Sequence, residues 1–201
     1  MKLRKDVLPK VTGRAVYAND IVLPGMVYAK VVRSTIPSGR IRSIDTSAAL
    51  EMPGVLRVFT AGDIPGIPSQ PRERPVLCPD RVRCVGDGVA LVVAESPEEA
   101  AAAAAAVRVD LEPLPALLDA ERALDEDAPL VHETGNRIAR YVTVRGDAET
   151  ALAAAPHVLR RRYTTPRVQH VCIETEAAVA SYDPGTGETL VRCPVNGPFP
   201  I

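Results

Sequence analysis

The stretch GVALVVAESPEEAAAAAAAVRVDL, residues 88–111, decides the fold of this chain. It begins with a continuous apolar run, residues 88–94, as expected of a strand that is covered on both faces. Ser96 is a good helix N-cap, the proline after it suits the first helical position, and Glu99 completes a capping box. Seven alanines continue the helix, and residues 107–111 predict a second strand. The stretch therefore predicts a strand–helix–strand, βαβ-like unit, whose strand order stays open.

Short β-rich runs separated by turn residues precede this stretch. They predict strands over residues 26–32, 40–44 and 55–60. Between the last two, residues 45–47 are suited to cap a short helix over residues 48–51, which Pro53-Gly54 stops. The proline-rich residues 65–79 show no clear period and predict a long surface loop.

The chain after residue 111 changes in character. Residues 113–139 are acidic and contain prolines, with one weak helix near residues 120–124, which indicates a connection between two domains. A second alanine-rich helix is expected after Gly146-Asp147, with Asp147 as its N-cap. Strands are expected over residues 158–171, 177–182 and 189–194. Residues 183–187 are expected to form the turn of a hairpin between the last two strands.

Composition narrows the function class. The chain has 201 residues, 46% of them hydrophobic but only 3% aromatic and none Trp, so its core must consist of Val, Leu, Ile and Ala. Its net charge of −1 gives no basic surface for nucleic acid. We interpret the triplet Arg160, Arg161 and Arg162 as the solvated edge of a strand. No apolar run approaches a membrane span and no secretory signal opens the chain, so we expect a cytoplasmic protein without a membrane partner.

Four cysteines occur, and none forms a CxxC pair. Because iron–sulfur and zinc sites need thiolates at tight spacings, we expect no metal-ligating residue in this chain. Cys172 and Cys193 lie in apolar, strand-like runs, where a cysteine is usually a small buried hydrophobic residue. His132 and His157 also lack metal-ligand spacing.

Two titratable positions invite a functional interpretation. His170 and Glu174 resemble an acid/base pair. At positions i and i+4 of a strand, however, their side chains face the same side but lie well apart, which favours a structural role. Asp87 lies in a glycine-flanked turn, where an aspartate commonly bonds nearby backbone. We therefore expect no catalytic residue among the three.

Taken in order, the segments resemble the beginning of the large, molybdenum-binding subunit of the xanthine dehydrogenase/aldehyde oxidase family. The resemblance covers essentially the whole chain, and the order and spacing of short motifs make it specific. The matching segments are Arg4 to Asp20, Leu23 to Tyr28, Arg33-Ser34, Ile44 to Thr46, Pro53 to Val55, Ala61 to Gly66, Val85 to Ala90, Leu114-Pro115, Gly146-Asp147, His170 to Glu174 and Ala177 to Ala180.

The resemblance implies an α+β fold, in which an α/β-hammerhead domain is followed by an incomplete mixed α/β segment. Residues 1–115 correspond to the hammerhead domain, residues 116–145 to a linker, and residues 146–201 to the truncated start of the first molybdopterin-binding domain. Where the family often has Gly-(Gln or Glu)-Pro before a strand, this chain has Gly86-Asp87-Gly88.

The family hydroxylates its substrates at a molybdenum centre on a pterin cofactor, with water as the oxygen source and a glutamate as general base. The family's glutamate and glycine-rich cofactor loops fall after the part matched here, so the resemblance implies a portion that is not active alone. Molybdopterin is then bound only in the complete assembly. The implied partners are the remaining molybdopterin-binding polypeptide and chains that carry iron–sulfur and FAD centres.

Only two residues of this chain are expected to reach the cofactor. The family has a Gln-Gly-Pro-Phe-like loop whose Gln lies near the molybdenum ligands, and here Asn196 and Gly197 stand in that loop. Asn196 keeps the amide group but is one methylene shorter.

Two other interpretations stay open from the sequence. One alternative is that the chain is a stand-alone, non-catalytic binding or assembly module, or the product of an interrupted gene. A weaker hypothesis is a small independent enzyme that uses His170 and Glu174.

Overall fold

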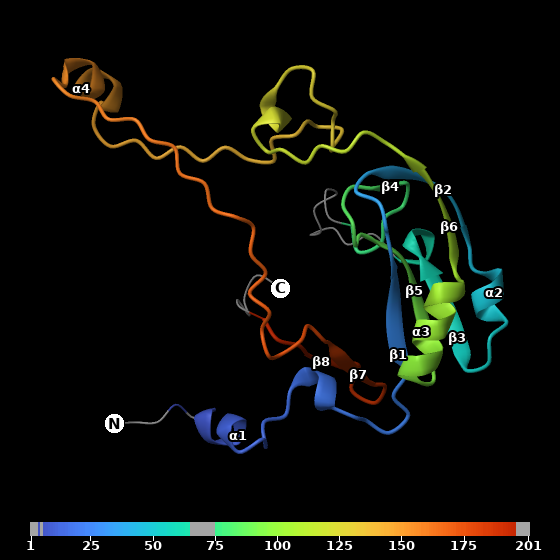
Figure 1. Cartoon of the computed structure of the whole chain (residues 1–201). Coiled ribbons are helices and arrows are strands. Elements are labelled where there is room, and N and C mark those ends of the chain that lie inside the picture. The colour runs from blue at the N-terminus through green and yellow to red at the C-terminus, as the bar shows by residue number, and fades with distance from the viewer. Residues whose placement is uncertain (1–3, 5, 65–74, 196–201) are drawn as a thin grey trace. The chain divides into compact units, whose positions relative to one another are not determined.

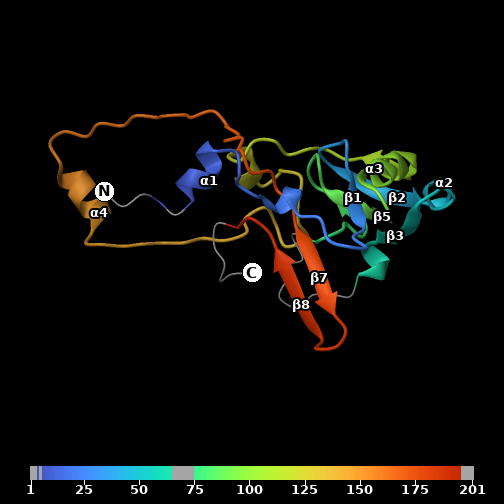
Figure 2. The ribbon, with the colours of Figure 1, turned by 90° about the horizontal axis from the view of Figure 1, so that it is seen from below.

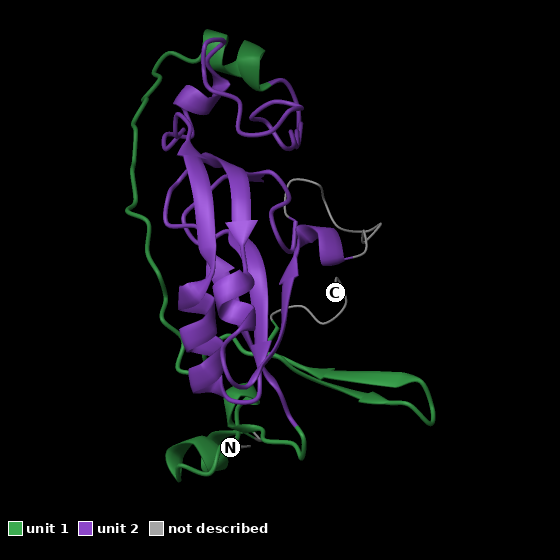
Figure 3. Cartoon of the chain, turned by 90° about the vertical axis from the view of Figure 1, so that its right-hand side faces the viewer, with its two compact units in different colours: residues 1–25, 148–201 green, residues 26–147 purple. Residues whose placement is uncertain are grey.

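The computed structural model describes residue 4, residues 6–64 and residues 75–195. The chain divides into two compact units (Figure 3). Unit 1 comprises residues 1–25 and 148–201, and unit 2 comprises residues 26–147. Helices and small antiparallel sheets occur side by side, which confirms the α+β class.

Unit 2 is built on two three-stranded sheets whose paired strands are all antiparallel (Figure 1). The first sheet has the order β1 (Tyr28–Arg33), β5 (Gly88–Ala94), β3 (Val55–Thr60). The second has the order β4 (Arg81–Val82), β2 (Gly39–Asp45), β6 (Arg108–Pro113).

Strand β5 is the centre of the first sheet, as its apolar sequence predicts. Val89 and Ala90, which point to opposite faces of the sheet, are both fully buried. Val92 and Ala94 are also buried. Because β1 and β3 pair along its two edges, β5 has no free edge. The face of Ala90, Val92 and Ala94 is fully buried, whereas Leu91 and Val93 on the opposite face are partly accessible.

Helix α3 (Pro97–Ala106) begins at its expected cap. The backbone N–H of Glu99 donates to Ser96 Oγ at 3.2 Å, and the Ser96 hydroxyl donates to the Glu99 carboxylate at 2.8 Å. Ala100 and Ala103 are buried, whereas most other alanines of the helix stay at least partly accessible. Small side chains on the buried side therefore let the helix lie close to the sheet.

The expected succession of strand, helix and strand forms, but its two strands lie in different sheets, so the segment is not a βαβ unit. Helix α3 leaves β5 in the first sheet and leads into β6 of the second, where β6 pairs antiparallel with β2. Both edges of β5 are already occupied, so β6 has no place beside it. Strand β6 instead pairs with β2 in a register that sets Leu111 opposite Ile41.

The core of unit 2 consists of two adjoining clusters. One is formed by Ala49, Val92, Ala103 and Val107, with further residues packed around it. The other is formed by Cys78, Val82 and Val89. Ile44 and Val109, from β2 and β6, pack against both clusters and so join them. As the composition predicts, the buried side chains are mainly valine and alanine.

Short helices complete unit 2. Before α2 (Ser47–Leu50), Asp45 Oδ1 accepts a hydrogen bond from the backbone N–H of Ser47 at 3.0 Å, while the N-cap residue, Thr46, makes no side-chain capping bond to a described residue. After it, Gly54 adopts φ +74°, which suits the expected stop at Pro53-Gly54. These helices are α2 (Ser47–Leu50), η2 (Ala61–Asp63) and η3 (Arg122–Leu124).

Unit 1 has little regular structure (Figure 2). The expected hairpin forms from β7 (Val179–Asp183) and β8 (Glu188–Arg192), and the alanine-rich helix forms as α4 (Ala148–Ala154). The remaining helices are α1 (Val7–Val11) and η1 (Ala18–Asp20).

Two predictions for unit 1 are wrong. Residues 158–171 contain no assigned strand, because no other described segment pairs with them. Cys172 and Cys193 are exposed rather than buried, since the runs around them are not covered by a second layer.

Candidate functional site

His170 and Glu174, which the sequence indicates as a possible acid/base pair, both line a cavity of about 920 Å³ in unit 1. Its wall comes from the irregular segment before β7 and from the residues that follow β8. The lining residues are Gln169, His170, Val171, Cys172, Glu174, Thr175, Glu176, Pro194 and Val195. Amide, imidazole and carboxylate groups therefore face one space.

His170 and Glu174 line this cavity together, whereas a strand through both residues would hold their side chains well apart. The segment is irregular, so the two side chains are not fixed on one face of a sheet. Among the described residues, no hydrogen bond or ion pair joins His170 to Glu174. The structure thus places them near one another without the contact that an acid/base pair requires.

Val171, between these groups, has an unusual backbone conformation. Its φ of +43° makes it the only non-glycine residue with positive φ in the described part of the chain. For a β-branched side chain this region is unfavourable, at a cost on the order of 1–3 kcal/mol. This strained residue lines the cavity, and no sequence pattern predicts its conformation.

Glu174 also borders a second, smaller cavity of about 410 Å³, formed mainly by residues from Asp6 to Tyr17. One cation that lines this cavity, Lys10, is paired with Asp6, because its Nζ lies 2.7 Å from the Asp6 carboxylate. The Lys10 and Arg4 side chains lower the pKa of Asp6, while Asp6 raises the pKa of Lys10. Glu174 therefore connects two cavities within unit 1.

The two residues expected to bind the cofactor, Asn196 and Gly197, lie outside the described residues. The last described residue, Val195, lines the larger cavity together with Pro194. The assignment of Asn196 and Gly197 stays a prediction.

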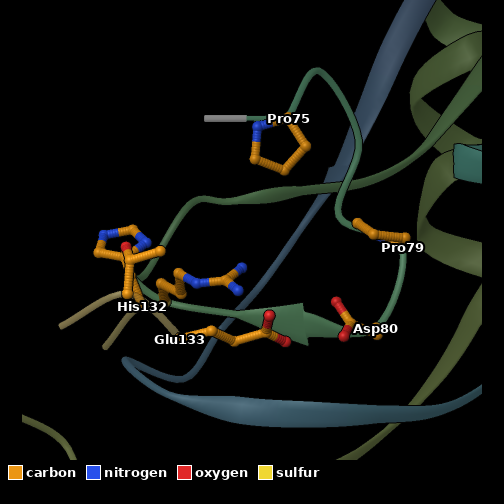
Figure 4. A pocket seen from close by; sticks show the side chains of 7 residues that line it. Pro75, Pro79, Asp80, His132 and Glu133 are labelled. Atoms are coloured by element: carbon orange, nitrogen blue, oxygen red, sulfur yellow. The ribbon is translucent and has the colours of Figure 1, made fainter. Parts of the chain in front are cut away.

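Unit 2 contains a separate cleft of about 360 Å³ (Figure 4). Arg83 lines it, but its guanidinium is engaged: Nε donates to the Val131 carbonyl at 3.0 Å and Nη1 to the Arg81 carbonyl at 3.2 Å. These bonds fasten residues after η3 to strand β4. The other lining residues are Pro75, Pro79, Asp80, His132, Glu133 and Thr134.

Asn136 organises the segment that Arg83 holds. Its side-chain oxygen accepts from the Val131 N–H at 2.8 Å, and its amide donates to the carbonyls of Ala123 and Pro129, both at 3.1 Å. Neither Arg83 nor Asn136 was among the residues predicted from the sequence. The neighbouring Gly135 was the one local sign of a turn for Asn136, and nothing local marks Arg83.

Asp87 behaves as the sequence predicts. Its carboxylate accepts hydrogen bonds from the backbone N–H groups of Arg83 at 2.6 Å and Cys84 at 3.0 Å, and from the Cys84 thiol at 3.0 Å. Partial burial works to raise the pKa of Asp87, but these hydrogen bonds outweigh it and the pKa is lowered. The same thiol bond raises the pKa of Cys84.

Other kinds of site find no support in the described residues. No group of three or more His, Cys, Asp or Glu side chains there is arranged to hold a metal ion. The cysteine nearest a core, Cys78, is buried, and burial raises its thiol pKa to about 11. None of the described helices is long and apolar enough to cross a membrane.

Comparison with known proteins gives two family matches in sequence order. Residues 12–115 match the aldehyde oxidase and xanthine dehydrogenase a/b hammerhead domain. Residues 131–201 match the molybdopterin cofactor-binding domain. The boundaries at residues 115 and 146 expected from the sequence stay a prediction.

Individual relatives agree with these matches. The chain is 40% identical over 196 residues to a probable xanthine dehydrogenase subunit of Bacillus subtilis, covering 94% of this chain and 26% of that protein. It is 37% identical over 185 residues to the nicotinate dehydrogenase large molybdopterin subunit of Eubacterium barkeri, covering 90% of this chain and 44% of that protein. The chain thus spans less than half of each.

The fold is shared as well. A structure of reconstituted CO dehydrogenase from Oligotropha carboxidovorans superposes with a TM-score of 0.83 at 34% identity, covering 96% of this chain and 26% of that one. Quinoline 2-oxidoreductase from Pseudomonas putida 86 gives a TM-score of 0.80 at 31% identity, covering 96% and 26% of the two chains. With its hammerhead match over more than half of its length, the chain belongs to the aldehyde oxidase and xanthine dehydrogenase family.

Proposed function

We propose that this chain forms the hammerhead domain and the start of the first molybdopterin-binding domain of a molybdenum hydroxylase large subunit. Residues 1–115 and 146–201 supply these two parts, and residues 116–145 join them. The observation that carries the proposal is the succession of both family matches along one chain, at residues 12–115 and 131–201. The chain is then not active alone, because other polypeptide completes the active site.

The groups around the larger cavity of unit 1 suit a polar cofactor. Gln169, His170 and Glu174 offer hydrogen-bond donors and acceptors on one wall. We expect the Asn196 amide and the Gly197 backbone, which follow that wall in sequence, to meet the molybdopterin. When bound, this cofactor supplies the oxidative hydroxylation of a substrate with oxygen from water. The contribution of this chain is to bind and orient it.

The proposal extends to partners and place. Electrons leave a molybdenum hydroxylase through iron–sulfur and FAD centres, which we assign to partner chains or subunits. The low net charge of −1 favours protein partners over nucleic acid. We place the assembly in the cytoplasm.

The test is the molybdenum content of the tagged chain, purified gently from its native host. Metal near one atom per chain supports the proposal. A chain without molybdenum, even in fractions that contain the host's molybdenum hydroxylases, would favour a stand-alone binding module instead. The matched control is the chain expressed alone in a host that makes the cofactor, where we expect no bound molybdenum.

A further inference from the structure

Residues 158–165 have the sequence of a strand but pair with no strand among the described residues. The run Val-Leu-Arg-Arg-Arg-Tyr-Thr-Thr is rich in β-branched, aromatic and long side chains. It follows α4 as an open trace (Figure 1). Within the described chain, no backbone-to-backbone hydrogen bond involves residues 158–161 or 163–165. The Arg160 carbonyl accepts a side-chain hydrogen bond from Arg161 Nη1 at 3.1 Å. Backbone groups that lack a strand partner are a template for strand addition.

The apolar side chains of this run are also uncovered. Leu159 is 76% exposed and Tyr163 is 87% exposed. In a strand these two residues would lie on one face. Helix α4 adds to the surface, because Leu152 is 57% exposed and lines the same cavity of about 630 Å³ as Val158. We call Leu152, Val158, Leu159 and Tyr163 the α4 surface.

The charge of the run points to the chemistry of its partner. Residues 156–173 contain four arginines and no Asp or Glu, in a chain whose net charge is −1. Among the described residues, no carboxylate forms an ion pair with Arg160, Arg161 or Arg167. A second copy of the run is a poor partner, since like charges on facing strands destabilise a sheet. An acidic strand is complementary.

We propose that residues 158–165 become a β-strand by pairing with an acidic, extended segment of the further molybdopterin-binding sequence with which this chain assembles. This inference rests on the proposed function. The run lies inside the residues matched to the cofactor-binding domain, and the Bacillus subtilis relative has about three quarters of its length outside the matched part. Pairing gives the backbone groups a strand partner, places cross-strand side chains beside Leu159 and Tyr163, and brings carboxylates to Arg160 and Arg161.

Hydrogen–deuterium exchange tests the pairing. The tagged chain expressed alone is compared with the molybdenum-containing complex isolated through the same tag from the native host. We expect amide exchange over residues 158–165 to slow by about tenfold or more in the complex, while exchange in β5 changes little. Fast exchange over residues 158–165 in a complex that does contain molybdenum would overturn the pairing and leave the proposed function intact.

Matched variants test the chemistry. We expect Leu159→Asp and Arg161→Glu to lower the molybdenum recovered with the chain by about tenfold, as loss of central interface contacts does. The controls Val144→Asp and Arg140→Glu alter exposed residues elsewhere and should leave recovery unchanged. Equal losses in all four variants would contradict the proposed surface.

Protection of the residue 158–165 amides from exchange in the chain alone, rising with its concentration, would identify a second copy as the occupant and overturn the proposal. Absence of any molybdenum-containing complex with the unaltered chain would remove the proposed function and this inference together.

Discussion

The carboxylate of Asp87 holds the turn that leads into β5. It accepts hydrogen bonds from two backbone N–H groups, those of Arg83 and Cys84. The backbone around it is tied to the end of β1, because the Ser34 N–H donates to the Asp87 carbonyl at 2.8 Å. The folded chain lowers the pKa of Asp87 below its usual 3.8. Its ionised form therefore stabilises the fold above that pH, and this contribution is lost as the pH falls through the lower, folded-state value.

We predict that Asp87→Asn lowers the free energy of unfolding at pH 7 by about 1–2 kcal/mol, the range expected when hydrogen bonds to a charged acceptor weaken. Denaturant titration measures the change. Asp80→Asn is the control, because the Asp80 side chain makes no hydrogen bond to another described residue. The difference in unfolding free energy between wild type and Asp87→Asn should begin to shrink below about pH 4, where the carboxyl of the unfolded chain gains its proton, and should be lost as the pH falls through the lower folded-state pKa. An unchanged gap at pH 3 would show that charge is not the cause.

Residue-level prediction from sequence succeeded where the chemistry is local. The role of Asp87 follows from its glycine neighbours, since a short acidic side chain in a turn bonds nearby backbone. The burial of Cys172 and Cys193 was wrong, because burial depends on a covering layer that neighbouring residues do not encode. The bonds of Arg83 to Val131 and of Asn136 to Ala123 join distant positions, so no local pattern announces them.

Among the elements, α3 depends on small side chains. Ala103 is fully buried against the core cluster that includes Val92, whereas Ala102 is exposed on the same helix. Helix propensity therefore explains why the helix forms, and side-chain size explains how close it lies to the sheet. The identical alanines of α3 therefore differ in how large a side chain each position can accept.

We predict that Ala103→Leu destabilises the protein by about 1–3 kcal/mol, because the added atoms overpack a close contact. The matched control, Ala102→Leu, makes the same chemical change on the exposed side and should stay within about 0.5 kcal/mol of wild type. Thermal or denaturant unfolding gives both values. Similar stabilities for the two variants would contradict the close packing of α3.

Helices and strands were predictable from the sequence where local residues determine them, but the pairing between distant strands was not. Strand β5 and helix α3 were predicted with their observed bounds, because apolar continuity and capping are local signals. The pairing of β6 with β2 was not, since it joins segments far apart in the chain and depends on which strand edges are free. Residues 158–171 have a strand's composition without a strand's partner, which is why the prediction failed there. The site residues Asn196 and Gly197 remain untested.

At the scale of the whole molecule, the two units differ in how they are stabilised. Both core clusters belong to unit 2. In unit 1, the buried apolar residues of the described chain are Ala18 and Val179, one on each side of unit 2 in sequence. A two-stranded hairpin and short helices give marginal stability on their own. Unit 1 should therefore open more readily than unit 2.

We predict that brief treatment of the isolated chain with trypsin cleaves first after the arginines at positions 160–162 and 167, which are exposed and lie outside any strand. Sites within the sheets, such as Arg42 in β2 and Arg57 in β3, should be cut much more slowly because strands must open first. Mass spectrometry of the early fragments identifies the sites. Cleavage at Arg42 or Arg57 as early as at residues 160–162 would show that the sheets of unit 2 are not the more stable part.

The chain order of the strands in unit 2 also bears on synthesis. Strands β1 and β3 both pair with β5, and β2 pairs with β4 and β6, so every ladder of unit 2 includes a strand that begins at Arg81 or later. A nascent chain paused on the ribosome before that residue has emerged carries β1, β2 and β3 without any of their partners. These early strands must wait for the later ones, which makes the growing polypeptide a candidate for chaperone binding until α3 and β6 have been released.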